Sequence, residues 1–360
     1  MKRLLAVFLL LALLPLPRAE AAETTTFSIL GDSISTYEGY SDNGAANETI
    51  AGYRLYYPRW GNSVEAKDTW WYQAAQMLDL RLLVNNSFSG SCLLKAAYGA
   101  EGAYLDRCVQ MHSGEEDPDI IAVYLGTNDY YAYGDTLGTF GSIDFDHLIT
   151  PEGYGSPETT MEAYAITLHK IKARYPDADI YCFTLLPLGD SDIQPEHFNA
   201  DILRLAEHFG CTGVDLMGCG IVPRIHMGDA LHPEKAGMDA ITAAFVSAVL
   251  ENAGRGCAVT YQLTDTASTG GTPDFVPEGK GFATELVNRT AAPYLAVTVT
   301  MDGIDITPYC LRDNRISIAH VTGALTITAE PAASEPERTL PDLSAAVSGL
   351  LAGSAAAAVK

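Results

Sequence analysis

Five short apolar runs recur along the first part of the chain, and the segments between them have helical character. The runs are TTFSIL (25–30), LRLLVN (80–85), DIIAVYL (119–125), ADIYCFTLL (178–186) and CTGVDL (211–216). Continuous apolar strands that alternate with helices are typical of a parallel sheet covered on both faces. The pattern predicts a doubly wound α/β domain, in which ligands bind beyond the carboxyl ends of the strands.

The ends of the expected helices are marked by capping and charge signals. Residues 68–80 start at an aspartate, residues 156–175 run from acidic to basic side chains, and residues 196–210 end at a glycine. A last helix, 233–252, has a proline in its first turn. These elements assign residues 22–253 to the α/β domain.

After this domain the sequence changes to alternating segments rich in Thr and Val, such as AVTYQLT (258–264), YLAVTVTMDG (294–303) and RISIAHVTGALTITAE (315–330). Period-two patterning between glycine and proline turns predicts a small antiparallel β-module at residues 257–330. It contains no catalytic constellation, so it is expected to be an accessory unit and a candidate for polysaccharide binding. Residues 331–360 are linker-like and then alanine-rich, which favours a frayed helix or a disordered tail.

The amino terminus has the pattern of a secretory signal peptide at residues 1–21. Lys2 and Arg3 precede an apolar run and then the small residues of a cleavage site. The run is shorter than the ~20 residues that a membrane span needs, so no stable span is expected. The sequence therefore predicts a secreted or extracytoplasmic protein.

The formal net charge of −23 disfavours nucleic acid and anionic membrane surfaces as partners and favours neutral substrates. Seven cysteines are too few for a disulfide framework and show no C-x-x-C spacing for zinc. The sequence implies no metal or other cofactor. Cys92 with Cys108, or Cys211 with Cys219, could bridge in an oxidising compartment.

Polar residues follow the expected strands at the points where catalytic side chains would lie. Ser33 follows the first strand in GDS, Gly90 the second in NNSFSGS, and Asn128 the third in GTND. Asp229 and His232 occur in GDALHP, beyond the fifth strand. In a doubly wound fold all of these segments converge on one rim of the sheet.

The residue types suit nucleophilic catalysis. A serine hydroxyl is a weak nucleophile until a histidine takes its proton and an acid fixes the tautomer of that histidine. The three-residue spacing lets Asp229 reach His232, whose other ring nitrogen can face Ser33. The N–H groups of Ser33 and Gly90 and the amide of Asn128 could then stabilise an oxyanion.

These four blocks, in this order, resemble the SGNH or GDSL hydrolase superfamily over residues 25–250. The resemblance implies a flavodoxin-like three-layer α/β/α fold and hydrolysis of ester or thioester bonds without a cofactor. It assigns the nucleophile to Ser33, the oxyanion positions to Gly90 and Asn128, and the acid and base to Asp229 and His232. One departure is Ile34, which stands where the namesake motif has leucine and keeps the position apolar.

Two residues could replace a member of the Asp229–His232 pair. Separately, two stretches of the chain are expected to shape the pocket. His226 and Asp215 lie near enough in sequence to replace a member of the pair, although His226 is expected to be a solvated loop histidine. The stretches 53–71 and 129–148 are rich in aromatic side chains and are expected to overhang the site, where rings suit stacking on sugars.

These observations predict a secreted serine esterase that acts on a small-molecule or glycan ester, and they favour the removal of short acyl groups, such as acetyl, from carbohydrate. The alternatives are a lipid esterase, lysophospholipase or thioesterase, and a non-catalytic glycan-binding surface protein.

Overall fold

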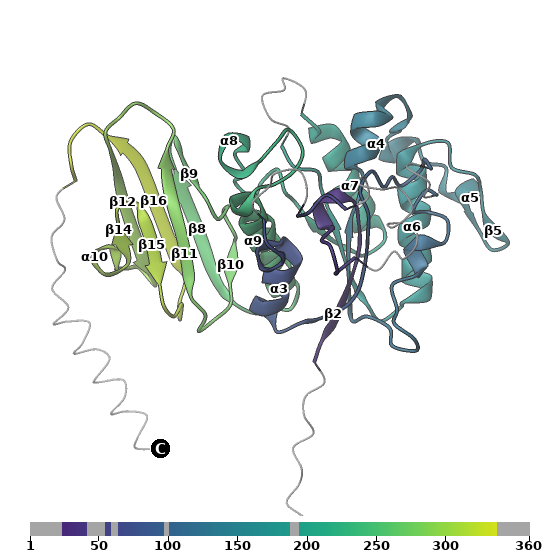
Figure 1. Cartoon of the computed structure of the whole chain (residues 1–360), viewed down its shortest axis with the longest axis horizontal. Helices are drawn as coiled ribbons and strands as arrows, with labels where there is room; N and C mark the ends of the chain where they lie inside the picture. The colour runs from purple at the N-terminus through teal and green to yellow at the C-terminus, as the bar shows by residue number, and fades with distance from the viewer. Residues whose placement is uncertain (1–23, 42–54, 59–63, 97–100, 188–193, 337–360) are drawn as a thin grey trace, which may run out of the picture.

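The computed structural model describes residues 24–41, 55–58, 64–96, 101–187 and 194–336. The expected signal peptide and residues 337–360 of the expected tail lie outside these residues. An α/β domain with a central sheet leads into a β-sandwich, and α3 (Trp70–Leu78) and α9 (Lys235–Asn252) lie between the two (Figure 1).

The central sheet is parallel and has the strand order β2-β1-β3-β6-β7. Its strands are β1 (Thr26–Gly31), β2 (Arg81–Ser87), β3 (Ile120–Tyr124), β6 (Asp179–Phe183) and β7 (Thr212–Val214). This is the flavodoxin-like order of a doubly wound sheet. The fold class expected from the alternating apolar runs is therefore confirmed.

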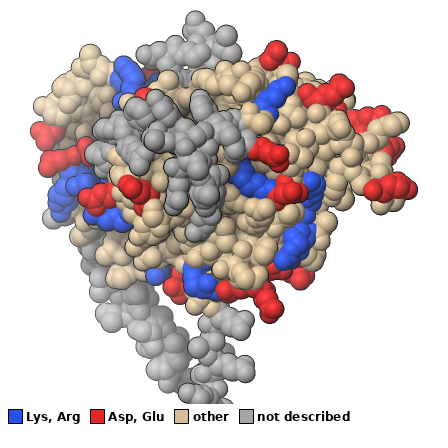
Figure 2. Space-filling view, turned by 45° about the vertical axis from the view of Figure 1, so that its right-hand side comes forward, with Lys and Arg blue, Asp and Glu red and all other residues tan. Residues whose placement is uncertain are grey.

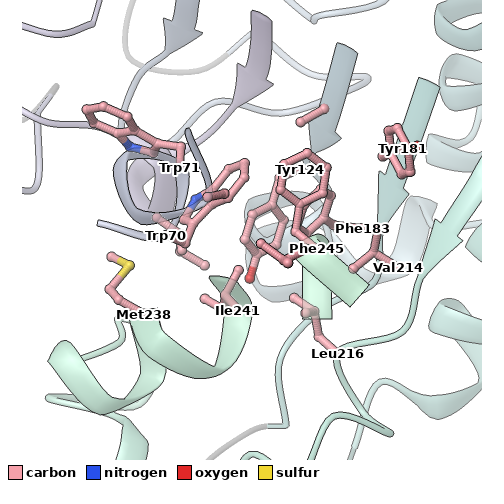
Figure 3. Close-up of a cluster of buried hydrophobic side chains, with 14 of the residues drawn as sticks. Trp70, Trp71, Tyr124, Tyr181, Phe183, Val214, Leu216, Met238, Ile241 and Phe245 are labelled. Carbon is pink, nitrogen blue, oxygen red and sulfur yellow. The ribbon is translucent and has the colours of Figure 1, made fainter. Parts of the chain in front are cut away.

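Helices cover both faces of this sheet, as buried parallel strands require. On one face α3 and α9 pack on side chains of β1, β3, β6 and β7, and the centre of this core holds several aromatic rings among aliphatic side chains (Figure 3). Trp70 stands against Phe183 and Phe245, with ring centroids 5.0 and 5.6 Å away. On the other face lie α6 (Thr160–Arg174) and α7 (Glu196–His208).

The start of α6 shows how local sequence sets a helix boundary. Thr159 accepts a hydrogen bond from the N–H of Glu162, whose carboxylate accepts one from the N–H of Thr159 in return. This capping box satisfies amide groups that have no partner inside the helix. The helix therefore begins at Thr160, four residues after the start of the expected 156–175 segment.

The C-terminal module is a two-sheet sandwich with its own apolar core. One sheet has the order β10-β8-β16-β12-β13 and the other the order β14-β15-β11-β9. The strands are β8 (Cys257–Leu263), β9 (Thr266–Ser268), β10 (Phe275–Val276), β11 (Phe282–Asn288), β12 (Tyr294–Met301), β13 (Ile304–Asp305), β14 (Leu311–Arg312), β15 (Arg315–Ile318) and β16 (Leu325–Ala332). The module is almost entirely antiparallel, but β16 pairs with β8 in parallel.

This sandwich is docked on the α/β domain rather than carried on a free linker. The N–H of Phe275 donates to the hydroxyl of Ser247 on α9, at 2.8 Å, and the N–H of Thr272 donates to the carbonyl of Cys219, at 2.7 Å. Gly271 has φ +71°, and a Cβ there would lie 2.9 Å from the Cβ of Ala240. The contact is close enough to demand glycine.

The stretch 129–148 differs from the long overhanging loop expected from sequence. It contains α4 (Thr127–Ala132), α5 (Phe145–Leu148) and two 3-10 turns, Gly134–Thr136 and Phe140–Ser142. The ring of Phe145 stacks on His208 of α7, with centroids 4.3 Å apart, and Tyr130 packs on Phe198. Most of these rings cover α7, because burying them there removes apolar area from water.

Cysteine placement and surface charge complete the picture of the fold. All seven cysteines are described and all are free thiols, so neither of the two possible disulfides is present. Acidic and basic side chains are interspersed on the face shown in Figure 2. In the described part of the chain, no helix combines the length and apolar character needed to cross a membrane.

Candidate active site

The turn after β1 places Ser33 at the start of a short 3-10 helix, η1 (Ser33–Ser35). Asp32 is extended, and its Oδ1 accepts a hydrogen bond from the N–H of Ile34, at 3.0 Å. Gly31 allows this turn, since a Cβ would lie only 2.5 Å from the hydroxyl of Ser87. The N–H of Ser33 begins the helix, where no intrahelical acceptor exists, so it can serve a ligand.

Strand register brings the other expected positions to the same rim. Gly31 pairs with Ser87 of β2 and with Tyr124 of β3. Gly90, with φ +75°, and Asn128 therefore leave the sheet beside Ser33. The Nδ2 of Asn128 donates to the carbonyl of Ser91, at 3.0 Å, which orients the amide. Because an amide nitrogen carries two hydrogens, the second N–H remains for another acceptor.

Ser33, His232 and Asp229 form one chain of hydrogen bonds. His232 Nε2 lies 2.9 Å from Ser33 Oγ, and His232 Nδ1 lies 3.0 Å from Asp229 Oδ2. The backbone fixes the acid, since Asp229 Oδ1 accepts the N–H groups of Leu231 and His232 at 2.7 and 2.6 Å. An imidazole placed in this way can take the proton of the serine hydroxyl.

The surroundings of this pair set its protonation. Partial burial alone would raise the pKa of Asp229, but the N–H groups of Leu231 and His232, the imidazole and the hydroxyl of Tyr56 together hold that pKa below its usual value. Burial lowers the pKa of His232, against the opposing charge of Asp229. The pair therefore favours an ionised acid beside a neutral base at physiological pH.

Tyr56, which was not singled out from sequence, contacts both members of the pair. Its hydroxyl donates to Asp229 Oδ2 at 2.8 Å, and its ring stacks on His232 with centroids 3.5 Å apart and planes at 10°. The aromatic density of the 53–71 stretch marked the region, but pointed to substrate contact. Elsewhere in that stretch, Tyr57, Trp70 and Trp71 are core side chains.

Comparison with known proteins identifies the family. The family model of GDSL-like lipase/acylhydrolase matches residues 25–249. The chain belongs to this family.

Two solved structures of Bacteroides proteins are similar to this GDSL-like acylhydrolase. One is described as a GDSL-like lipase from Bacteroides ovatus and is 28% identical to this chain. The match covers 61% of this chain and 95% of that one, with a TM-score of 0.47. Another, from Bacteroides uniformis, is 26% identical, with 64% and 96% covered and a TM-score of 0.47. A search of the curated proteins gave no significant match.

The two competing residues of this acylhydrolase lie in other surroundings. Asp215 Oδ1 accepts the N–H of Met217 at 2.9 Å, which closes a turn after β7, and no contact with His232 is present among the described residues. His226 is fully buried, so the expectation of a solvated loop histidine is wrong. It lies in α8 (Pro223–His226), and its Nε2 is 3.0 Å from the carbonyl of Ser268 in the β-sandwich.

A buried charged group lies beneath the rim of the acylhydrolase site. The guanidinium of Arg107 donates to the carbonyls of Gly31 and Asn86, at 3.2 and 3.0 Å, and to the hydroxyl of Ser91. It thereby joins the ends of β1 and β2 to the loop that carries Gly90. Burial lowers the pKa of Arg107 to about 10, while the carboxylates around it act in the opposite direction.

The carboxyl group of Asp32 interacts with the charge of Arg107. Burial raises its pKa from 3.8 to about 7, although the N–H of Ile34 and the charge of Arg107 oppose the change. The hydroxyl of Thr127 acts in the same direction as these two groups. Clusters of His, Cys, Asp and Glu able to hold a metal ion are absent from the described residues of this acylhydrolase.

Proposed function

We propose that this ester hydrolase is a secreted serine esterase that removes short acyl groups, acetyl above all, from carbohydrate. The observation that carries the chemistry is the hydrogen-bonded chain from Ser33 through His232 to Asp229. In this proposal Ser33 is the nucleophile, His232 the general base and then acid, and Asp229 the group that orients the imidazole.

The reaction follows from these positions. His232 Nε2 takes the hydroxyl proton as Ser33 Oγ attacks the ester carbonyl, and negative charge develops on the carbonyl oxygen. The N–H groups of Ser33 and Gly90 and the second N–H of Asn128 donate to that oxygen. His232 then protonates the leaving alcohol as the C–O bond breaks. A water molecule, deprotonated by the same imidazole, hydrolyses the acyl-serine and restores Ser33.

A small pocket at Ile34, the residue that follows Ser33, supports the short acyl group. Its lining includes Ile34, Tyr131, Leu186 and Leu231, and its volume is about 10 Å³. A space of that size holds about one water molecule, and a methyl group is of similar size. A longer chain would need these side chains to move before its added methylenes could be buried.

The charge and an exposed aromatic ring of the surface support a carbohydrate substrate. The net charge of −23 disfavours anionic lipid, while Tyr131, at 42% exposure, presents a ring at the edge of the acyl pocket. The leader pattern at residues 1–21 supports export, and mass spectrometry of the mature protein tests it. A mature protein that still contains residues 1–21 would refute cleavage.

The β-sandwich supports a polysaccharide partner through a groove of about 620 Å³ beside the α/β domain. Tyr261, Asp274 and Arg289 contribute an aromatic ring and both charges to its lining. We expect Arg289→Ala to weaken retention on insoluble acetylated xylan while turnover of a soluble aryl acetate stays the same. Unchanged retention would remove this groove from the proposal.

Two measurements test the central proposal. Ser33→Ala should lower the turnover of an aryl acetate by about 10³-fold or more; wild-type activity in that variant would refute the assigned nucleophile. Wild-type protein should lose kcat/KM beyond about four acyl carbons and release acetate from at least one acetylated xylan, pectin or chitin fragment. Efficiency that rises through eight carbons, with no acetate from any glycan, would favour the lipid esterase.

A further inference from the structure

Tyr56 is joined to all three residues of the proposed catalytic chain. Its hydroxyl and ring contact Asp229 and His232, as described above. Its N–H donates to Thr36 Oγ1 at 3.0 Å, and that hydroxyl donates to the carbonyl of Ser33 at 2.8 Å. One residue thus connects the turn of the nucleophile to the turn of the acid and base.

The neighbouring residue makes this connection rigid. The hydroxyl of Tyr57 donates to the carbonyl of Pro233 at 2.7 Å, directly after His232. The carbonyl of Tyr57 accepts the N–H of Glu38 at 3.1 Å, and its ring stands edge-on to Tyr56 with centroids 4.8 Å apart. Because Tyr57 is fully buried, segment 55–58 holds Tyr56 in a fixed position between the two turns.

Each part of Tyr56 has a distinct consequence. A ring parallel to the imidazole at 3.5 Å shields one face of His232 from water and prevents rotation out of plane. The hydroxyl holds Asp229 Oδ2 in the position from which it meets His232 Nδ1. With one ring face on His232 and the hydroxyl on Asp229, Tyr56 has little freedom to serve as a sugar platform.

We propose that Tyr56 is a positioning residue for the hydrolysis, in which the ring fixes the plane of His232 and the hydroxyl fixes the carboxylate of Asp229. This inference rests on the proposed function, since it needs these two residues to be the base and the acid. It predicts an effect on kcat rather than on the binding of substrate.

The test uses the full chain and an aryl acetate. Tyr56→Phe keeps the ring and should lower kcat about 3–10-fold, the effect of one lost hydrogen bond, with KM within about twofold. Tyr56→Leu removes both contacts and should lower kcat by about 30–100-fold. Tyr154→Phe is the matched control: it deletes an exposed phenol that contacts His169 at 2.9 Å, and kcat should not change.

The pH profile gives a second readout. The groups that contact His232 are Asp229 at Nδ1, Ser33 at Nε2 and Tyr56 on the ring face. Loss of the Tyr56 hydroxyl leaves the charge of Asp229 more available to an imidazolium ion. The acid limb of kcat/KM should therefore move to higher pH in Tyr56→Phe, and stay in place in Tyr154→Phe.

The outcomes separate this inference from the proposed function. Activity in Ser33→Ala would refute the proposed site itself. The role of Tyr56 alone would be overturned by a different result. In that case Ser33→Ala is inactive, but a folded Tyr56→Phe keeps the wild-type kcat and the wild-type pH profile. A raised KM with unchanged kcat would also overturn it, because that pattern belongs to a residue that binds substrate. Tyr56→Phe decides the matter even if Tyr56→Leu does not fold.

Discussion

The buried His226 gives the sharpest prediction about how the two parts of the molecule depend on each other. Because a backbone N–H can only donate, His226 Nδ1 accepts the N–H of Val222, at 2.8 Å. Nε2 then carries the hydrogen and donates to the carbonyl of Ser268. The carbonyl of His226 accepts the N–H of Glu234 at 3.0 Å, just beyond His232. The imidazole thus secures the Asp229–His232 turn to the β-sandwich.

Replacing His226 with alanine removes both side-chain hydrogen bonds and leaves the partly buried N–H of Val222 and the buried carbonyl of Ser268 short of a partner. The cost is about 1–3 kcal/mol for each group, and it is partly relieved because the Ser268 carbonyl also accepts the N–H of Gly271, so the loss of stability should be about 2–5 kcal/mol. Loosening the turn should also lower kcat about tenfold or more. His226→Gln, which keeps a long-reach donor, should lose less than half as much stability.

The assay is urea unfolding of the full chain, monitored by tryptophan fluorescence and by turnover of an aryl acetate. His320→Ala is the control, because that histidine is exposed on the sandwich and its loss should cost less than about 0.5 kcal/mol. If His226→Ala unfolds at the wild-type urea concentration and keeps the wild-type kcat, the imidazole does not join the two parts in the way described.

Three further predictions follow from the site. Asp229→Asn should lower kcat by about 10³–10⁴-fold, whereas Asp215→Asn should change it little; a larger loss at Asp215 would reassign the acid. Because burial lowers the pKa of His232, the midpoint of the acid limb in the pH profile of kcat/KM should lie below pH 6.5. A midpoint above that value would contradict a buried neutral base. Asp32 has a pKa raised to about 7 in the folded chain, so the native state holds this proton more firmly than the unfolded state. The free energy of unfolding therefore falls as pH rises from about 4 to 7, by up to roughly 4 kcal/mol. Asp32→Asn should therefore gain stability relative to wild type between pH 5 and pH 8 in urea unfolding, and a constant difference across that range would refute the assignment.

Much of the fold could be predicted from local pattern. Apolar runs between helices predicted the parallel sheet, and the buried strands follow the expected segments within a few residues. The same order of elements placed Ser33, Asp229 and His232 near one another, because the carboxyl ends of parallel strands share a rim. Each of these inferences depends on neighbours in sequence or on a regular topology.

The parts that were missed depend on contacts between distant segments. Tyr56 meets Asp229 across 173 residues, and nothing in the local pattern YRLYYP distinguishes a ring that holds a histidine from one that faces substrate. The buried His226 meets its partner, the Ser268 carbonyl of the sandwich, 42 residues later in the chain. A bridge between Cys211 and Cys219 is possible from sequence, but the Cys211 thiol contacts Cys182 on β6 instead.

The parallel pairing of β8 with β16 has a consequence for the order of folding. Leu325 pairs with Val259, so β8, the first strand of the sandwich, gains this partner only when β16, the last strand, is in place. Such distant pairings close slowly compared with local ones. The α/β domain, complete by Asn252, should thus reach a compact state before Ser268 can hold His226. In refolding experiments, recovery of ester hydrolysis should then trail recovery of helical signal, and simultaneous recovery would show that the active-site turn matures without the sandwich.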